Sequence, residues 1–192
     1  MGDRNLPGAQ KKAAREDRTL IFVDEAAFYM LPAALRTYAP CGETPVLKYR
    51  YWEHVSMISA ITPAGKLYTW TQETAFDGPA IVRFLKHVGR HISGKILVVW
   101  DRLPAHRSHW VKEFLRSKMG QRFYLAQLPS YSPDLNPDEG VWNYLKRVEL
   151  KNVCCHDLPE LRTELRKAVA RLRHKKDIIQ SFIRQVYPDL FL

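Results

Sequence analysis

An uninterrupted apolar run over residues 96–100 constrains the fold of this chain most, because it ends abruptly at a carboxylate, Asp101. A strand covered on one face alternates apolar and polar side chains, whereas a strand covered on both faces is apolar throughout. Strands of the second kind occur in parallel regions of sheets that carry helices on both faces. The run therefore predicts a layered α/β protein, with Asp101 at the edge where a buried strand emerges.

The remaining patterns supply the other elements of such a sheet. Strands are expected at residues 19–28, 51–61, 66–71, 95–100 and 122–128. Helices are expected at residues 77–92 and 107–118, around Glu139, and at residues 158–174 and 176–186. Turn chemistry at residues 62–65 joins the second and third strands as a hairpin, and the later strands follow crossover helices. This order predicts a mixed α/β sheet flanked by helices.

The chain of 192 residues is long enough for one domain with a substantial core. Residues 1–18 are expected to be a tail or linker, residues 19–152 the main domain, and residues 153–192 a basic helical extension packed on it. Residues 30–50 contain three prolines and predict an irregular excursion. No apolar run approaches the roughly 20 residues of a membrane span, and no signal-peptide pattern opens the chain. With three cysteines, too few for a disulfide framework, these features predict a cytoplasmic protein.

The positive charge is concentrated toward the C-terminus. The formal net charge is +10, and residues 142–176 hold ten Lys or Arg against four acids, a net charge of +6. A basic region beside a cluster of acids suggests that one part holds a polyanion while another processes it. A solvated helix surface explains the charge alone equally well, and both readings stay open at this point.

Three separated carboxylates have the placement that metal-dependent phosphodiester chemistry needs. Asp24 follows the apolar run at residues 20–23, Asp101 follows residues 96–100, and Glu139 begins a helix after a proline-punctuated loop. Two acids on strand ends and a third on a helix can hold divalent cations against phosphate oxygens. Taken alone, Asp24 fits a turn-forming role, and Asp101 has the same structural alternative.

Glu139 also fits a structural role, that of a capping-box acid. Asn136 suits the N-cap and Pro137 the first helical position, which places Glu139 at N3. At about 100° per residue, however, Glu139 shares one polar stripe with Asn143 and Lys146. The opposite face carries Val141, Tyr144, Leu145 and Val148. Glu139 is therefore expected to face away from the core, toward metal and DNA.

Two neighbours of these acids admit more than one role. Strand alternation puts Glu25 on the opposite sheet face from Asp24, which makes Glu25 a bystander or a support for a ligand. His106 lies five residues after Asp101, in a loop at the same sheet edge. A phosphate contact or a supporting role is expected of His106, and Arg107 adds to such a phosphate site. A capped or core histidine is the structural alternative.

These residues lie in three motifs that together resemble a known family. The first is Phe-Val-Asp-Glu at residues 22–25, and the second is Val-Trp-Asp at residues 99–101 with Pro-Ala-His-Arg-Ser at residues 104–108. The third and most specific runs over residues 128–146, from Leu-Pro through Ser-Pro-Asp-Leu-Asn-Pro-Asp-Glu to Trp-Asn-Tyr-Leu-Lys. From about residue 18 to about residue 151, the chain is similar to the catalytic domain of DDE transposases of the mariner superfamily, in their bacterial insertion-sequence branch.

The resemblance implies an RNase H-like fold and a DNA phosphoryl transferase. It identifies Asp24, Asp101 and Glu139 as catalytic, metal-binding acids for two Mg²⁺ or Mn²⁺ ions, which serve DNA cleavage and strand transfer by a 3′-OH. It implies transposon-end and target DNA as partners and a homodimer or larger active complex, in a bacterial, nucleoid-associated setting. The DNA-binding residues expected on this basis are His106, Arg107, Asn143, Lys146, Arg147, Arg166 and Lys167. An RNase H-like nuclease without strand transfer and a non-catalytic DNA-binding remnant of a transposase are the alternatives.

Two features depart from the family's pattern. Arg102 follows the second aspartate where a small or amide residue is expected, and this cation either competes with a metal pair or grips phosphate. Family members usually carry N-terminal helix-turn-helix modules, whereas about 18 residues precede the first expected strand here. The chain is therefore expected to bind DNA with little sequence preference, and to rely on a separate helix-turn-helix chain for recognition.

Overall fold

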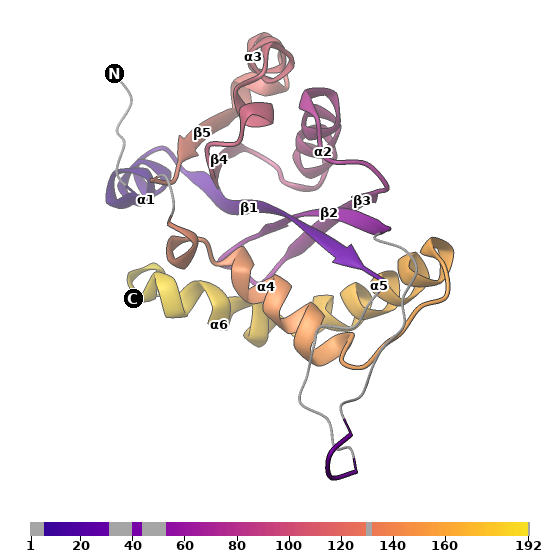
Figure 1. Cartoon of the computed structure of the whole chain (residues 1–192). Coiled ribbons are helices and arrows are strands. Elements are labelled where there is room, and N and C mark those ends of the chain that lie inside the picture. The colour runs from indigo at the N-terminus through magenta and orange to yellow at the C-terminus, as the bar shows by residue number, and fades with distance from the viewer. Residues whose placement is uncertain (1–5, 31–39, 44–52, 130–131, 192) are drawn as a thin grey trace.

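A computed structural model of the chain describes residues 6–30, 40–43, 53–129 and 132–191 (Figure 1). The described strands are β1 (Arg18–Tyr29), β2 (His54–Ile61), β3 (Leu67–Gln72), β4 (Lys95–Trp100) and β5 (Phe123–Gln127). The described α-helices are α1 (Leu6–Arg15), α2 (Gly78–His91), α3 (His109–Arg116), α4 (Asp138–Tyr144), α5 (Leu158–Arg173) and α6 (Lys176–Val186). None of these helices is long and apolar enough to cross a membrane.

The five strands form one mixed sheet in the order β3-β2-β1-β4-β5. Strand β1 pairs antiparallel with β2 and parallel with β4, and β5 pairs parallel with β4. Strands β2 and β3 form the predicted hairpin. Helices α2 and α3 cover one face of the sheet, while α4, α5 and α6 cover the other (Figure 1). The predicted mixed α/β sheet flanked by helices is confirmed.

Alternation along the central strands divides the core between the two helical layers. Phe22 is fully buried on the face that packs against α4, α5 and α6, while Val23 is fully buried on the α2–α3 face. In β4, Val99 packs on the face of α4, α5 and α6, and Val98 packs on the α2–α3 face. Fully burying an apolar side chain of this size contributes about 1.5–3 kcal/mol. Burial on both faces is what the continuous apolar run at residues 96–100 predicts.

Two helices begin at capping aspartates. The Asp77 carboxylate accepts a hydrogen bond from the Ala80 N–H at 2.9 Å at the start of α2. Asp157 accepts from the Glu160 N–H at 2.8 Å at the start of α5, and Glu160 accepts in turn from the His156 N–H at 2.7 Å. Such a cap stabilises a helix by about 1 kcal/mol. The predicted start of α5 is confirmed.

The structure differs from the sequence-based expectations on the N-terminal side. Helix α1 occupies part of the segment expected to be a tail, and its Ala13 is buried in the core on the α4–α6 face. Strand β1 covers the residues expected of it, but Asp24 lies within the strand and not at its end, because β1 stays paired with β2 as far as Tyr29. Most of the expected excursion at residues 30–50 lies outside the described residues.

Candidate active site

Asp24 and Asp101 stand at the same level of two neighbouring parallel strands. The parallel pairing of β1 with β4 ends at Phe22 opposite Val99, and each aspartate follows two residues later. Beyond this point β1 continues beside β2, with Asp24 opposite Ser59, while β4 ends. The two acids therefore lie where β1 and β4 part, at the carboxyl edge where open α/β sheets bind ligands.

The Asp24 carboxylate is mostly enclosed and is tied to helix α4. Its Oδ2 accepts a hydrogen bond from the indole Nε1 of Trp142 at 2.8 Å. Burial, together with the negative charges of Glu25 and Glu139, raises the pKa of Asp24 to about 7 despite the opposing hydrogen bond from Trp142. Because burial and like charges disfavour the ionised form, a bound cation would relieve both effects.

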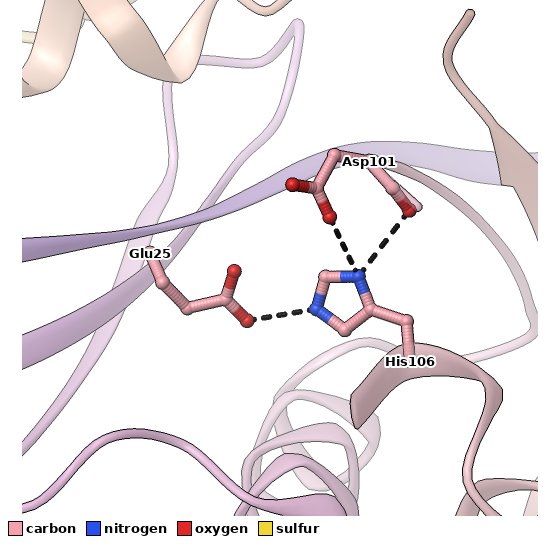
Figure 2. Close-up of side chains that lie close together, drawn as sticks. All are labelled: Glu25, Asp101 and His106. Carbon is pink, nitrogen blue, oxygen red and sulfur yellow. Dashed lines mark hydrogen bonds and ion pairs between the residues drawn. The ribbon is translucent and has the colours of Figure 1, made fainter. Parts of the chain in front are cut away.

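His106 bridges two acids on the α2–α3 face of the sheet (Figure 2). Its Nδ1 lies 2.9 Å from Asp101 Oδ1 and its Nε2 lies 2.8 Å from Glu25 Oε1. The imidazole stacks on Trp100, with ring centroids 4.1 Å apart. Burial works to lower the pKa of His106, but hydrogen bonds to Asp101 and Glu25 outweigh it and raise the pKa to about 9. Both ring nitrogens therefore donate, and His106 is an imidazolium between two carboxylates at neutral pH.

The same contacts orient Asp101. Burial works to raise the pKa of Asp101, but hydrogen bonds from His106 and from the Leu103 N–H, the latter at 2.9 Å, lower it. Glu25 lies on the opposite sheet face from Asp24, as predicted, and reaches Asp101 only through the histidine (Figure 2).

The expectation that His106 contacts DNA is not met in this structure. Its side chain is 0% exposed, because the turn η1 (Pro104–Arg107) folds the ring back onto Trp100 between the two carboxylates. A buried ring with both nitrogens engaged cannot reach a phosphate. The supporting role, which was the other expectation for His106, fits these contacts.

Glu139 begins α4 on the exposed side of that helix, as its polar stripe predicts. Its negative charge contributes to the raised pKa of Asp24, and Trp142, three residues later on the same helix, contacts Asp24 directly. Glu139 and Asn143 also line a cavity of about 360 Å³ between α4 and α6. Among the described residues, one group of three offers potential ligand atoms that all lie within 4.8 Å of one another. This group is Glu25, Asp101 and His106. The three predicted metal ligands thus approach one sheet edge without all lying that close together.

Asp138 is a further acid at the site, and it is not among the site residues predicted from the sequence. It is fully buried, and one carboxylate oxygen accepts a hydrogen bond from the Ser59 hydroxyl. Burial raises the pKa of Asp138 well above its ordinary value, and nearby carboxylates, Asp24 first among them, add to the effect. The signal was present in the sequence, since helical spacing puts Asp138 on the face of Val141 and Trp142.

The donor set fits a hard divalent cation. Carboxylate oxygens are the ligands that Mg²⁺ and Mn²⁺ prefer in proteins. Two buried carboxylate oxygens, Glu25 Oε2 and Asp138 Oδ2, have no hydrogen-bond partner in the part of the chain that the structure describes. The raised pKa of Asp24 reflects the same local excess of negative charge. A cation at this edge would neutralise that excess.

Lys146 lies beside these acids. Its Nζ is 5.1 Å from the centroid of the Phe28 ring, which holds the half-buried side chain against β1. Burial lowers the pKa of Lys146, while the negative charges of Glu139 and Asp24 oppose that shift. Lys146, which is a predicted DNA contact, therefore has its positive charge within the field of two predicted metal ligands, Glu139 and Asp24.

A π-helical turn, η4 (Leu145–Glu149), follows α4 and changes which side chains face solvent. Val141 is fully buried as expected, but Val148 is 55% exposed. A π-helical turn accommodates an extra residue, so the regular helical phase is lost over this segment. The prediction that Val148 lies on the apolar face is wrong for this reason. Asn143 and Arg147 are exposed, as a role in DNA binding requires.

The remaining predicted contacts to DNA lie on the surface. Arg107 is exposed at the end of η1, and Arg166 and Lys167 are exposed on α5. Arg102 donates from its Nε to the Leu128 carbonyl oxygen at 3.1 Å. Through this bond Arg102 contacts the chain that leaves β5.

Comparisons with known proteins agree with this geometry. A family model described as DDE superfamily endonuclease matches residues 19–162. The Mos1 mariner paired end complex with Mn has a TM-score of 0.69 at 13% identity, with 93% of this chain and 56% of that chain covered. The Mos1 strand transfer complex has a TM-score of 0.63 at 14% identity, with 94% and 59% covered. The catalytic domain of Mos1 mariner transposase has a TM-score of 0.59 at 12% identity, with 94% and 89% covered. No curated protein sequence matches the chain.

The structural likeness shows the fold. The chain spans more than half the length of the Mos1 chains in the DNA complexes and most of the Mos1 catalytic domain. The predicted RNase H-like fold is therefore confirmed. Because the family match extends over most of the sequence and includes all three predicted metal ligands, this chain belongs to the DDE superfamily endonucleases.

Proposed function

We propose that this chain is the catalytic part of a transposase, which cuts DNA at the ends of a mobile element and joins the freed 3′-OH to target DNA. The observation that carries the proposal is the placement of Asp24 and Asp101 at one level of adjacent strands, with Glu139 close to Asp24 on α4. Family membership supports endonuclease chemistry. The similar Mos1 structures, described as paired end and strand transfer complexes of a mariner transposase, support the joining step.

Asp24, Asp101 and Glu139 are proposed to hold two Mg²⁺ or Mn²⁺ ions, and the Mos1 complexes described with Mn and with Mg support this choice of metal. When bound, such ions activate the attacking oxygen and stabilise the leaving oxygen of an in-line displacement. In cleavage, a water oxygen bonds to phosphorus as the bond from phosphorus to the 3′ oxygen breaks, which leaves a 3′-OH. In joining, that 3′-OH displaces a 3′ oxygen of the target strand, so the number of phosphodiester bonds is conserved.

The chain's own residues hold this arrangement before any ligand arrives. The indole of Trp142 fixes one oxygen of Asp24, and His106 fixes one oxygen of Asp101. Each carboxylate has a second oxygen that could bind a cation. Lys146 offers a positive charge to the phosphate at the acids, where the enclosed setting strengthens that interaction.

The surface cations are proposed to hold the rest of the DNA. The proposed contacts are Arg107, Asn143, Lys146, Arg147, Arg166 and Lys167. The paired-end descriptions of the Mos1 complexes support a homodimer or larger assembly on two element ends. The bacterial nucleoid is the proposed setting.

A strand-transfer assay tests this function. The chain is incubated with Mn²⁺, a labelled duplex taken from the inverted repeats that flank its gene, and a supercoiled target plasmid. The expected result is nicking of the duplex, followed by covalent joining of its 3′ end to the plasmid. Nicking without joining would instead identify a plain nuclease. DNA binding without nicking would identify a non-catalytic remnant.

A further inference from the structure

A polar pocket lined by arginines lies away from the acids, between helix α5 and the β2–β3 hairpin. Its volume is about 300 Å³. We call it the arginine pocket, and the polar side chains that define it are Arg162, Arg166, Arg173, Thr69 and Thr71. No acid is among the described residues that line it. Three guanidinium groups and two hydroxyls are a donor set for an anion.

Two hydrogen bonds position the Arg173 side chain in the lining of this pocket. Its Nε donates to the Leu67 carbonyl oxygen at 3.2 Å and its Nη2 donates to the Thr69 hydroxyl at 2.9 Å. Burial lowers the pKa of Arg173. A guanidinium that is already fixed loses little conformational entropy when it binds an anion.

The other two arginines stand one helical turn apart on α5 and face the same pocket. Arg162 pairs with Glu73 at 3.0 Å, but both side chains are about half exposed, and such a pair contributes little. The Nε of Arg162 is buried without a hydrogen-bond partner among the described residues. Arg166 is exposed and lines the same wall. The pocket therefore keeps a net positive charge and an unused, buried donor.

The pocket shares a sheet face with Asp24. Met57 forms part of its lining and pairs with Ala26 across β1 and β2, while Ser59 pairs with Asp24. Met57 and Ser59 point to the same face, because they are two residues apart on β2, a separation of about 7 Å. A DNA strand whose phosphate lies at the acids is thus within a few nucleotides of the pocket.

We propose that the arginine pocket binds a backbone phosphate of DNA outside the reacting site, and so fixes the path of the strand that leaves the acids. This inference rests on the proposed function. The fork of a guanidinium matches two phosphate oxygens at once, which makes a phosphodiester the anion that suits this pocket. The pocket contributes affinity and register, not sequence reading, because phosphate contacts carry no sequence information directly.

The test is DNA binding by Arg166→Gln and Arg162→Gln in EDTA, measured over a range of salt concentrations. Arg83→Gln is the matched control, because Arg83 is an exposed arginine on α2, which covers the other face of the sheet. Each pocket variant is expected to weaken binding severalfold and to reduce the slope of log affinity against log salt by about one. Arg83→Gln is expected to match the parent. Equal effects of the pocket and control variants would overturn the proposal.

A methylphosphonate scan locates the phosphate. Neutralising single phosphates along the duplex is expected to reveal one position whose loss weakens the parent chain but not Arg166→Gln, because the contact is already absent in that variant. If neutralising each phosphate reduces the DNA affinity of the parent and of Arg166→Gln equally, the pocket does not hold a defined phosphate and the proposal fails. Inorganic phosphate, added at constant ionic strength, is the second arm. Displacement of DNA by micromolar phosphate through Arg166 would identify a site for free phosphate and overturn the assignment to DNA.

Failure of this inference is distinguishable from failure of the proposed function. If the parent chain nicks DNA with Mn²⁺ and the pocket variants bind DNA as the parent does, the pocket assignment falls while the function stands. If the coupling between Arg166 and one phosphate is observed but no variant or parent nicks DNA, the function falls while the pocket stands.

Discussion

The indole Nε1 of Trp142 donates a hydrogen bond to Asp24 Oδ2 at 2.8 Å and so joins helix α4 to strand β1 at the candidate active site. Trp142 is only 4% exposed, and its ring packs edge-on against Phe28 with centroids 5.9 Å apart. Glu139 lies three residues earlier on the same helix. One contact therefore fixes both the orientation of Asp24 and the position of Glu139 relative to it.

Replacing Trp142 by Phe is expected to weaken Mn²⁺ binding, because Asp24 would rotate freely and the acids would no longer be held for a shared cation. The lost bond is also expected to reduce the free energy of unfolding by about 1–2 kcal/mol. Titration of Mn²⁺ followed by the electron paramagnetic resonance of the free ion measures the affinity. Trp110→Phe is the control, since Trp110 is 47% exposed on α3 and is expected to leave binding unchanged. Parent-like Mn²⁺ affinity in Trp142→Phe would contradict the role of this contact.

The Asp24→Asn variant is expected to be more stable than the parent at about pH 8 in the absence of divalent metal. Burial raises the pKa of Asp24 from 3.8 to about 7 in the folded chain. Between these values the folded state binds more protons than the unfolded state, so the contribution of Asp24 to stability falls as pH rises through this window. The upper limit of the effect is about 4 kcal/mol. Urea unfolding at several pH values measures it, and Mg²⁺ is expected to stabilise the parent but not the variant. A difference between the two proteins that stays constant with pH would count against the raised pKa.

The sheet, and the places on it of the residues predicted to bind metal, could be predicted from sequence because their signals are local. An apolar run that ends in an acid marks a buried strand and its carboxyl edge, and this applies to Asp101 directly. For Asp24 the same reasoning predicts an acid at a strand end, whereas β1 runs past it, because the antiparallel partner β2 that pairs with this part of β1 is contributed by a distant segment.

The contacts that surround the ligands depend on packing between elements, which periodicity does not reveal. His106 becomes buried only because η1 folds onto Trp100, and Asp138 only because α4 docks over Ser59 on β2. The exposure of Val148 follows from a π-helical turn, and regular helical spacing cannot anticipate one.

The pairing of His106 with Glu25 is expected to be cooperative. His106→Gln removes the positive charge between two carboxylates and is expected to reduce the free energy of unfolding by about 3 kcal/mol near neutral pH. Because the folded pKa of His106 is raised from 6.5 to about 9, this stabilisation is fully present below the lower value and is lost as pH rises through the upper one.

A double-mutant cycle with Glu25→Gln measures this coupling by urea unfolding. The decrease in the free energy of unfolding caused by both substitutions together is expected to be smaller, by at least about 1 kcal/mol, than the sum of the decreases caused by each one alone. Strict additivity would mean that the 2.8 Å contact between His106 and Glu25 contributes nothing to stability.

Asp138→Asn is expected to be tolerated, because burial raises the pKa of Asp138 and so favours the uncharged carboxyl group, which a neutral amide resembles. An amide of the same shape keeps a hydrogen-bonding group beside Ser59. Asp138→Ala removes that partner from a fully buried site and is expected to cost about 2 kcal/mol more than the Asn variant. Thermal unfolding of both variants provides the comparison, and equal losses for Asn and Ala would indicate that Asp138 acts through its negative charge.

The most direct test of the metal-ion assignment is Mn²⁺-dependent nicking of DNA by the parent chain and by Asp101→Asn, measured at saturating metal with DNA binding followed in parallel. Asp101→Asn keeps the size of the side chain but removes the charge that serves the cation. Nicking is expected to fall by about a hundredfold or more, while DNA binding is retained or becomes tighter, because a carboxylate without its metal repels phosphate. Parent-like nicking by Asp101→Asn would contradict the assignment of these acids as the ligands of a catalytic metal pair.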